Sequence, residues 1–290
     1  MPPKRNIYML RQHLASNGRS TVRPYDHMTR CHTIAIFNHK GGVGKTTTAV
    51  NLAASLAYRY GKRCLVVDMD PQANATRALL GKELDETQPT IRCVLAPDGA
   101  TPCTLSDILI GTVVPNLILA PAALNLSEAE FKLATRTNRE LILREHLRTV
   151  APSFDYILID CAPSLGLLAL NGLAAATRVL IPCETQFLSL RGLRYVLDVL
   201  ALVQSQLNPT LTVLGVLATK HYILSKANAE ALHCLKNLKQ VHVFDAVIPR
   251  DVKAEEAPSH GKPLVIYAPE ARATKQYLEL AQEVITLCRG

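Results

Sequence analysis

The stretch that decides the fold is Lys40-Gly41-Gly42-Val43-Gly44-Lys45-Thr46-Thr47-Thr48, a glycine-rich turn flanked by lysines. It follows an apolar run that predicts a strand at Thr33–Phe37 and precedes an amphipathic run that predicts a helix at Lys45–Tyr60. In this order, the backbone N–H groups of the turn can converge on an anion at the positive end of the helix. The stretch therefore predicts a phosphate-binding loop, or P-loop.

The residues of this loop have distinct chemical tasks in a nucleotide site. Lys45 supplies a mobile cation for the β- and γ-phosphates, and the hydroxyl of Thr46 is placed to bind Mg²⁺. We expect ATP and Mg²⁺ as cofactors. The residues of the loop expected to bind the nucleotide are Lys40, Gly41, Gly42, Val43, Gly44, Lys45, Thr46 and Thr47.

Outward from the loop, apolar β-branched runs alternate with helical patterns of ten to twenty residues. The runs predict strands at Thr33–Phe37, Cys64–Asp68, Leu117–Ala120, Tyr156–Asp160, Arg178–Pro182, Thr212–Thr219, Val243–Ile248 and Leu264–Tyr267. Helices are predicted at Lys45–Tyr60, Asn138–Val150, Leu165–Ala176, Leu188–Leu207, Lys226–Leu238 and Ala273–Cys288, with an irregular surface excursion at Gly81–Gly111. This alternation favours an α/β fold with a doubly wound, mostly parallel sheet and helices on both faces.

Three carboxylates follow or end predicted strands. Asp68 and Asp70 close the second strand before Pro71, and Asp160 ends the apolar strand Tyr156–Asp160. The carboxyl edge of an open α/β sheet is where nucleotides bind, so these side chains are candidates to complete the site. Asp160 suits an anion held beside the metal. Asp68 or Asp70 could instead cap the N-terminus of a helix.

Lys40 stands where an ordinary P-loop requires no lysine. With this residue the chain resembles the deviant Walker A family, the ParA/MinD group of ATPases. The segment Asp68–Thr76 looks like the family's DxDPQGNAT, although Ala73 stands where glycine is usual. The segment Ile159–Gly166 is similar to the family's IDxPPSLG, with Ala162 in place of the first proline.

The C-terminal third resembles the ParA/Soj branch of this family. Residues 247–253 and 256–263 look like its pattern, so the resemblance extends over about residues 32–286. It implies that Pro249 and Arg250 help to hold the adenine base. A membrane-cycling MinD-type protein would need a basic amphipathic terminal helix, and residues 280–290 carry only Arg289 as a cation.

The resemblance also implies roles for the charged residues near the phosphates. Lys40 would reach the phosphates of a second subunit, so that the ATP-bound form is a homodimer; a merely solvated lysine is the alternative. Asp70 would position or activate the attacking water. Asp68 would support the magnesium and a switch region, and Thr46 and Asp160 would complete the metal site.

ParA proteins bind DNA without sequence preference as ATP dimers, so the resemblance implies non-specific DNA and a ParB-like activator as partners. Candidate DNA contacts are Arg191, Arg194, Lys220, Lys226, Lys236, Lys239 and Lys253. Taken alone, each fits a solvated surface cation better than a DNA contact, although dimerisation doubles the patch and phosphate contacts add. Residues 220–222 lack the aspartate and arginine of many chromosomal ParA proteins.

The charge is unevenly distributed along the 290 residues, whose formal net charge is +8. Residues 1–30 hold six Lys and Arg against one Asp, and we expect this basic leader to be flexible. It is either disordered, with Met28 as a possible true start, or an arm that binds nucleic acid. It is too short for a helix-turn-helix, which disfavours sequence-specific operator binding. Residues 31–290 are expected to form a single ATPase domain.

Cysteines and hydropathy bear on the cellular compartment. The eight cysteines form no CxxC pair, which indicates reduced thiols in a cytoplasm. No stretch approaches the roughly eighteen apolar residues of a membrane span. We therefore expect a cytoplasmic, nucleoid-associated protein without a membrane partner.

The preferred function is a partition ATPase that segregates chromosome or plasmid DNA. A close alternative is an ATPase that positions a protein cargo, such as a carboxysome or a chemotaxis cluster, through a cargo adaptor. A MinD-like membrane-cycling regulator and a P-loop enzyme of the dethiobiotin synthetase kind are further alternatives. Slow basal hydrolysis is expected for a switch.

Overall fold

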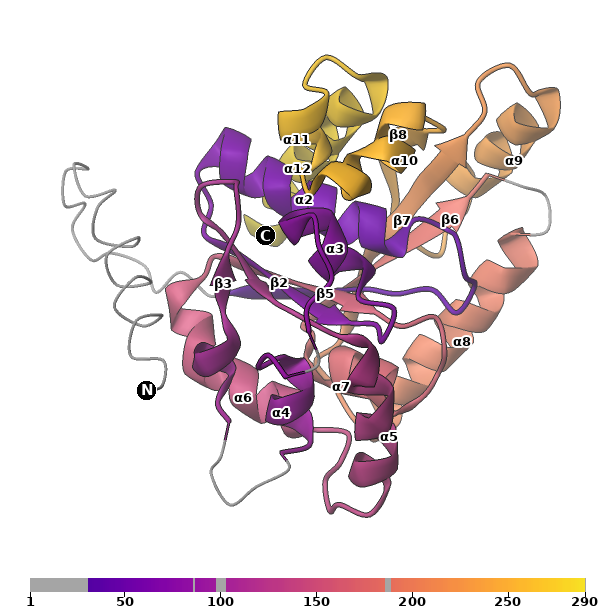
Figure 1. The fold of residues 1–290 in the computed structure, drawn as a ribbon. Coiled ribbons are helices and arrows are strands. Elements are labelled where there is room, and N and C mark those ends of the chain that lie inside the picture. Colours follow the sequence, from indigo (N-terminus) through magenta and orange to yellow (C-terminus); the bar gives the residue numbers. More distant parts are fainter. Residues whose placement is uncertain (1–30, 86, 98–102, 186–188, 290) are drawn as a thin grey trace.

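In a computed structural model of the chain, the described residues are 31–85, 87–97, 103–185 and 189–289, and the side chains of 189–191 are not described. The expected leader and Met28 therefore lie outside the described residues. Within them, one sheet has the strand order β3-β4-β2-β5-β1-β6-β7-β8 (Figure 1), with β3 antiparallel to β4 and the other pairs parallel. The strands are β1 His32–Ile36, β2 Cys64–Met69, β3 Ile110–Gly111, β4 Leu117–Ala120, β5 Tyr156–Cys161, β6 Arg178–Glu184, β7 Thr212–His221 and β8 Val243–Pro249.

Helices connect these strands, and the predicted helix at Lys45–Tyr60 has those bounds in the structure. The α-helices are α2 Lys45–Tyr60, α3 Asn74–Leu80, α4 Ile91–Leu95, α5 Ser127–Ala134, α6 Ile142–Val150, α7 Leu167–Ala175, α8 Ser189–Gln206, α9 Lys226–Lys236, α10 Val252–Glu256, α11 Leu264–Tyr267 and α12 Arg272–Arg289. Short 3₁₀ turns include Leu105–Ile108 and Ala257–His260. Among the described residues, no helix is both long and apolar enough to cross a bilayer.

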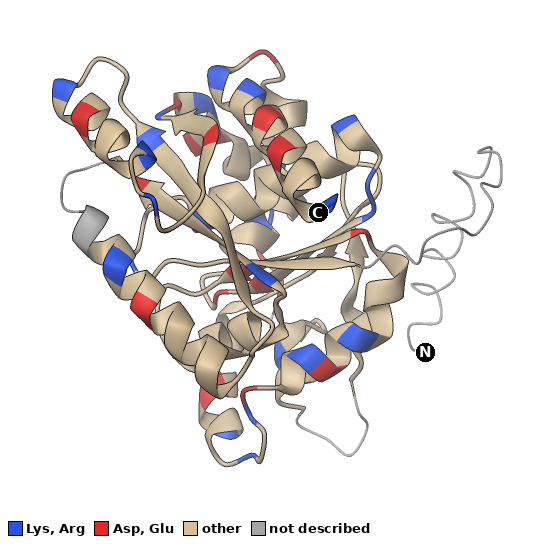
Figure 2. Ribbon diagram, turned by 180° about the vertical axis from the view of Figure 1, so that it is seen from behind, with Lys and Arg blue, Asp and Glu red and all other residues tan. Residues whose placement is uncertain are grey.

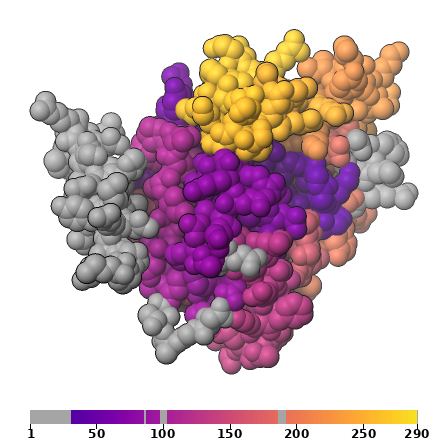
Figure 3. All heavy atoms as spheres, in the orientation of Figure 1, coloured from indigo at the N-terminus to yellow at the C-terminus, as the bar shows by residue number. Residues whose placement is uncertain are grey.

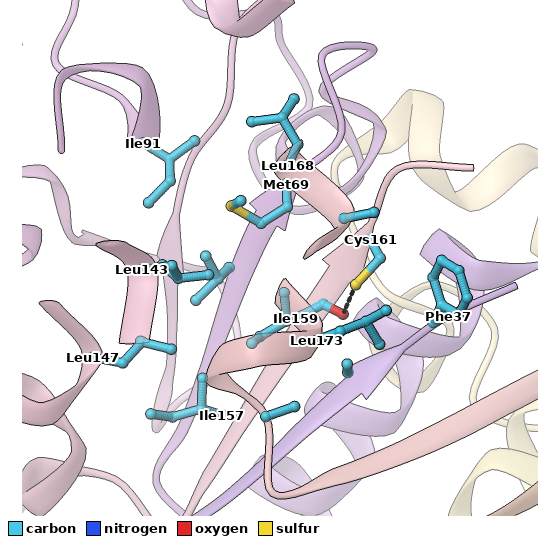
Figure 4. Packing of buried hydrophobic residues seen from close by; sticks show 14 of the residues in the cluster. Phe37, Met69, Ile91, Leu143, Leu147, Ile157, Ile159, Cys161, Leu168 and Leu173 are labelled. Atoms are coloured by element: carbon cyan, nitrogen blue, oxygen red, sulfur yellow. Dashed lines mark hydrogen bonds between the residues drawn. The ribbon is translucent and has the colours of Figure 1, made fainter. Parts of the chain in front are cut away.

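Helices cover both faces of the sheet, as Figure 1 shows. In β1, Ile34 and Ile36 belong to the buried cluster formed with α2 and α12. Ala35, and Phe37 just after the strand, belong to the cluster formed with α4 to α8. Figure 4 shows part of the second cluster, where Ile157 lies near the side chains of α6. Because both faces are covered, the central strands β2 and β5 are buried at every residue instead of alternating between buried and exposed. The predicted α/β fold class is confirmed.

Three predictions about local structure are wrong. Leu264–Tyr267 forms the short helix α11 instead of a strand, because Pro263 sits at its N-cap with a φ suited to a helix start. The helix predicted from Asn138 begins at Ile142, since Asn138 has a left-handed φ of 53°. The stretch Gly81–Gly111 is not a plain surface excursion: its described part contributes side chains to the core, namely Ile91, Val94, Leu95, Leu105 and Ile108.

Candidate functional site

The P-loop opens into a cavity of about 570 Å³ at the carboxyl edge of the sheet. Its walls come from the P-loop, from the segment after β2, and from the C-terminal segment 248–263, with Tyr277 of α12. In Figure 3 that C-terminal segment (yellow) lies directly against the indigo and purple N-terminal part of the chain. The sequence-predicted residues that line the cavity are Gly41, Gly42, Gly44, Lys45, Thr46, Thr47, Asp70, Lys220, Pro249 and Arg250. Its size suits a nucleotide.

Two glycines make the loop conformation possible. Gly42 and Gly44 have φ of 74° and 89°, and Gly44 is the N-cap of α2. Lys45 begins this helix, and its ammonium donates to the carbonyl oxygen of Lys40 at 3.1 Å. Burial lowers the pKa of Lys45, and the charge of Asp160 opposes that shift. A buried cation at a helix N-terminus has the electrostatics to bind phosphate.

The ends of β6 and β7 hold the loop from one side. The amide of Asn38 donates to the carbonyl of Pro182 at 2.8 Å and accepts from the backbone N–H of Lys40 at 3.0 Å. The hydroxyl of Thr219 donates to the carbonyl of Val43 at 2.8 Å. The side chain of Val43 is buried and does not line the cavity. Sequence reasoning missed Asn38 and Thr219, because each belongs to the site through a neighbouring strand.

Among the buried carboxylates, Asp160 has the properties that best fit a metal site. It is fully buried, and neither carboxylate oxygen has a hydrogen-bond partner. Burial and the charge of Asp68 raise its pKa well above the usual range; Thr46 lies close enough to oppose the rise. An unsatisfied buried carboxylate beside a threonine hydroxyl fits a magnesium ion or its water ligands, since a dication would supply the missing positive charge.

Asp68 lies beside Asp160, because the two are register partners on β2 and β5. Unlike Asp160, it accepts hydrogen bonds: from the N–H of Thr76 at 2.8 Å, from the Thr76 hydroxyl at 2.7 Å and from the N–H of Asp70 at 3.2 Å. Burial raises the pKa of Asp68 to about 6, against the lowering effect of the Thr76 bonds. Asp68 therefore holds the first turn of α3 against the sheet.

Asp70 lies one residue beyond β2 and lines the cavity. One carboxylate oxygen accepts from the N–H of Gln72 at 2.9 Å, and its backbone carbonyl accepts from the N–H of Ala73 at 2.8 Å. The N-cap of α3 is Ala73, in the left-handed region at φ 50°, so Asp70 is not the N-cap. Ala73, which stands where glycine is usual in the family, therefore has a backbone conformation that is strained for a residue with a side chain.

The far end of the cavity combines predicted and unpredicted residues. Pro249 and Arg250 line it as expected, and the guanidinium of Arg250 lies 3.6 Å from Glu255. Gly81, at the end of α3, packs directly on Gly261, and both have left-handed φ values. A Cβ on Gly261 would overlap the backbone of Gly81. Helix α3, whose first turn is held by Asp68, therefore ends against the loop that carries Gly261.

Lys40 lies outside the cavity formed by its own loop, at the rim of the sheet. Its ammonium is 3.0 Å from a carboxylate oxygen of Glu184, the last residue of β6. The side chain of Lys40 is 47% exposed and that of Glu184 is 17% exposed. Sequence reasoning singled out the lysine and missed the glutamate, which no motif marks.

The candidate DNA contacts differ in their surroundings. Lys220 lines the cavity, with a left-handed φ of 48°, so its position suits the nucleotide better than DNA. Lys236 and Lys253 are engaged in ion pairs with Asp245 and Glu256. Arg194, Lys226 and Lys239 are exposed, and the side chain of Arg191 lies outside the described residues. Figure 2 shows basic and acidic positions interspersed over this side of the molecule.

Comparisons with known proteins find relatives over most of the chain. A family profile described as an AAA domain matches residues 31–213. The chain is 44% identical over 251 residues to the sporulation initiation inhibitor protein Soj of Bacillus subtilis, covering 87% of this chain and 97% of that protein. It is 41% identical over 252 residues to the chromosome partitioning protein ParA of Myxococcus xanthus, covering 87% of each.

A solved structure supports the cofactors. Cobyrinic acid a,c-diamide synthase from Mycobacterium smegmatis, with bound ADP and magnesium, matches with a TM-score of 0.77 at 31% identity, over 90% of this chain and 96% of that chain. The same protein has been solved with an ATP analogue and magnesium. These bound nucleotides and magnesium agree with the ATP and Mg²⁺ expected as cofactors of this chain.

Proposed function

The chain belongs to the ParA/Soj family of chromosome-partitioning ATPases, and from this premise we propose that its ATP-bound form is a homodimer that binds DNA without sequence preference. A ParB-like protein accelerates hydrolysis and releases it. The protein then acts in the cytoplasm on the nucleoid, with slow basal turnover. The single observation that carries the proposal is the position of Lys40, whose ammonium lies outside its own cavity at an exposed rim.

The P-loop binds the triphosphate in this proposal. The N–H groups of residues 41–47 and the positive end of α2 face the phosphate oxygens, and Lys45 neutralises them. Thr46 and Asp160 hold the magnesium site, with Asp68 supporting it. Magnesium, when bound, offsets phosphate charge that develops during transfer.

Asp70 positions the attacking water. Its location suits this role because it lines the cavity and one of its oxygens is fixed by the N–H of Gln72. Asp68 acts indirectly: it holds α3, and so the segment that carries Asp70, through Thr76. Hydrolysis in such a site depends on positioning and charge, so no covalent nucleophile is required.

The other end of the cavity holds the base. Pro249 and Arg250 line the wall opposite the P-loop, and Lys220 lies between them and the P-loop along β7. We assign Lys220 to the nucleotide instead of to DNA. Tyr277, fully buried at the floor, shares a 3.4 Å hydrogen bond with Thr48 and fixes the depth of the cavity.

DNA binding depends on cations that dimerisation brings together. The exposed residues Arg194, Lys226 and Lys239, together with Arg191, are the contacts we propose. A single copy offers few phosphate contacts, whereas a dimer doubles them, and affinity rises steeply with their number. This explains how ATP could control DNA binding without any change within the contact surface.

The test is binding to a random-sequence duplex at low salt with Mg²⁺ and either a non-hydrolysable ATP analogue or ADP. We expect binding with the analogue, little with ADP, and a steep loss of affinity with rising salt. Lys40→Gln should lose binding, and Asp70→Ala should remain bound in ATP. Equal binding in both nucleotides would show that ATP does not control the DNA-binding form.

A further inference from the structure

Lys40 is the one residue of the P-loop that is exposed and does not line the cavity, and its ammonium forms an ion pair with Glu184. The two residues are far apart in sequence and meet at the rim of the sheet. Their polar atoms are 3.0 Å apart, which is hydrogen-bonding distance between an ammonium and a carboxylate. The lysine assigned to a second subunit is therefore held, in the single chain, by its own subunit.

Glu184 is the fixed member of this pair. It is the last residue of β6 and is in register with Thr219 of β7, so the sheet ladder holds its backbone. The N–H of Thr185 extends the ladder by donating to the carbonyl of Thr219 at 3.3 Å. The side chain of Glu184 is mostly buried and its backbone is held by strand pairing, so its carboxylate has less freedom to move than the ammonium of Lys40.

Lys40 is the movable member. Its backbone N–H is held by Asn38, but its side chain is nearly half exposed and carries the ammonium at the end of a flexible four-carbon chain. The ammonium can thus leave Glu184 without any change in the P-loop backbone. Lys40 can therefore move away from the ion pair while Glu184 stays in place.

We propose that Glu184 is a latch: its carboxylate retains Lys40 on its own subunit and must release it before Lys40 can reach the nucleotide of a second copy. This inference rests on the proposed function, because it takes the dimer and the role of Lys40 from there. Glu184 is a positioning residue, since it does not line the cavity. The latch disfavours dimerisation in the absence of a phosphate that competes for the ammonium.

The size of the effect follows from symmetry. A partly exposed ion pair shifts an equilibrium by about 1.5- to 5-fold. A two-fold symmetric dimer would break two such pairs, so the shifts multiply to about 2- to 25-fold. Because the pair is partly exposed, salt should weaken the latch. Binding of nucleotide to the monomer should not change.

The experiment measures the dimer dissociation constant by sedimentation of the full chain saturated with Mg²⁺ and a non-hydrolysable ATP analogue. Glu184→Gln keeps the shape of the side chain and removes its charge, and Glu184→Asp shortens it by one methylene. The matched control is Glu145→Gln, which breaks an exposed ion pair with Arg148 at 2.8 Å on α6. A titration of labelled ATP at low protein concentration verifies that each variant is folded.

The latch predicts that Glu184→Gln lowers the dimer dissociation constant 2- to 25-fold at low salt, less so at high salt, while Glu145→Gln does not. In the double variant of Glu184→Gln and Lys40→Gln, the increase in dimer affinity should be absent. An unchanged or weaker dimer in Glu184→Gln, with a wild-type chain that dimerises, overturns the latch and leaves the proposed function standing. A saturated wild-type chain that stays monomeric overturns the dimer, and the latch with it.

Discussion

Replacing Thr76 by valine should destabilise the protein, and by more at alkaline than at acidic pH. The hydroxyl of this fully buried residue donates to Asp68 at 2.7 Å and accepts from the N–H of Ala122 at 2.9 Å. Valine has nearly the same volume and offers neither a donor nor an acceptor. The carboxylate of Asp68 loses a donor, and the N–H of Ala122 is left buried without a partner.

The magnitude follows from these two losses. A hydrogen bond to a charged group contributes about 1.5–3 kcal/mol, and an orphaned buried donor costs about 1–3 kcal/mol. We expect a decrease in the free energy of unfolding of about 3–5 kcal/mol at pH 8. At pH 5 Asp68 is protonated in the folded protein, its bond to Thr76 is between neutral groups, and the decrease should be about 1 kcal/mol smaller.

The sign of the pH dependence comes from the pKa of Asp68. Burial raises it from 3.8 to about 6 in the folded protein, so the stability that this group contributes is complete below pH 4 and is lost as pH rises through 6. The loss amounts to about 3 kcal/mol. Thr76→Val removes a bond that lowers this pKa, so the loss grows and extends to higher pH.

Urea unfolding followed by circular dichroism at pH 5 and pH 8, in EDTA and without nucleotide, measures both effects. Thr76→Ser is the control, because it keeps the hydroxyl and loses one methyl group. A destabilisation below about 1 kcal/mol at pH 8 would refute the reasoning, given the cost of two lost partners. So would a destabilisation that is larger at pH 5, since Asp68 would then not be the ionised partner.

Two further substitutions probe the cavity walls. Gly261→Ala should destabilise the protein by at least about 2 kcal/mol and weaken ATP binding, because a left-handed φ of 61° and an overlap with Gly81 both oppose a side chain. Melting curves and an ATP titration test this prediction. The control is Gly111→Ala, where a Cβ meets nothing within 4 Å. Asp160→Asn should abolish magnesium-dependent hydrolysis. It should also stabilise the metal-free protein by about 1–3 kcal/mol at pH 8, because it removes a buried carboxylate whose oxygens have no hydrogen-bond donor. An Asp160→Asn protein that is less stable in EDTA than the unmodified chain would contradict this.

The sequence was informative where a residue's task depends on its neighbours along the chain. The P-loop, the strand before it and the helix Lys45–Tyr60 follow from local spacing, as does the place of Asp160 near the carboxyl end of β5. Helix α3 escaped prediction because it has only seven residues and its N-cap is Ala73, an alanine with a left-handed φ that offers no side-chain cap. Its cap function comes instead from Asp68, on the preceding strand.

Contacts across the sheet could not be predicted from the sequence. Asp68 and Asp160 are in register because β2 and β5 are neighbours, an order that no local pattern fixes. Glu184 reaches Lys40 for the same reason, since β6 lies beside β1. Lys220 resembled a surface cation in the sequence, and its place at the cavity depends on where β7 ends relative to the P-loop.

The central claim is that Lys40 joins two copies of the chain through ATP. Its most direct test is the mass in solution of the chain with Mg²⁺ and a saturating non-hydrolysable ATP analogue. We predict twice the 31.7 kDa of one chain, reverting to one chain in ADP and in the Lys40→Gln variant. A mass of one chain under saturation, or a Lys40→Gln protein that dimerises as well as the unmodified chain, would contradict the claim.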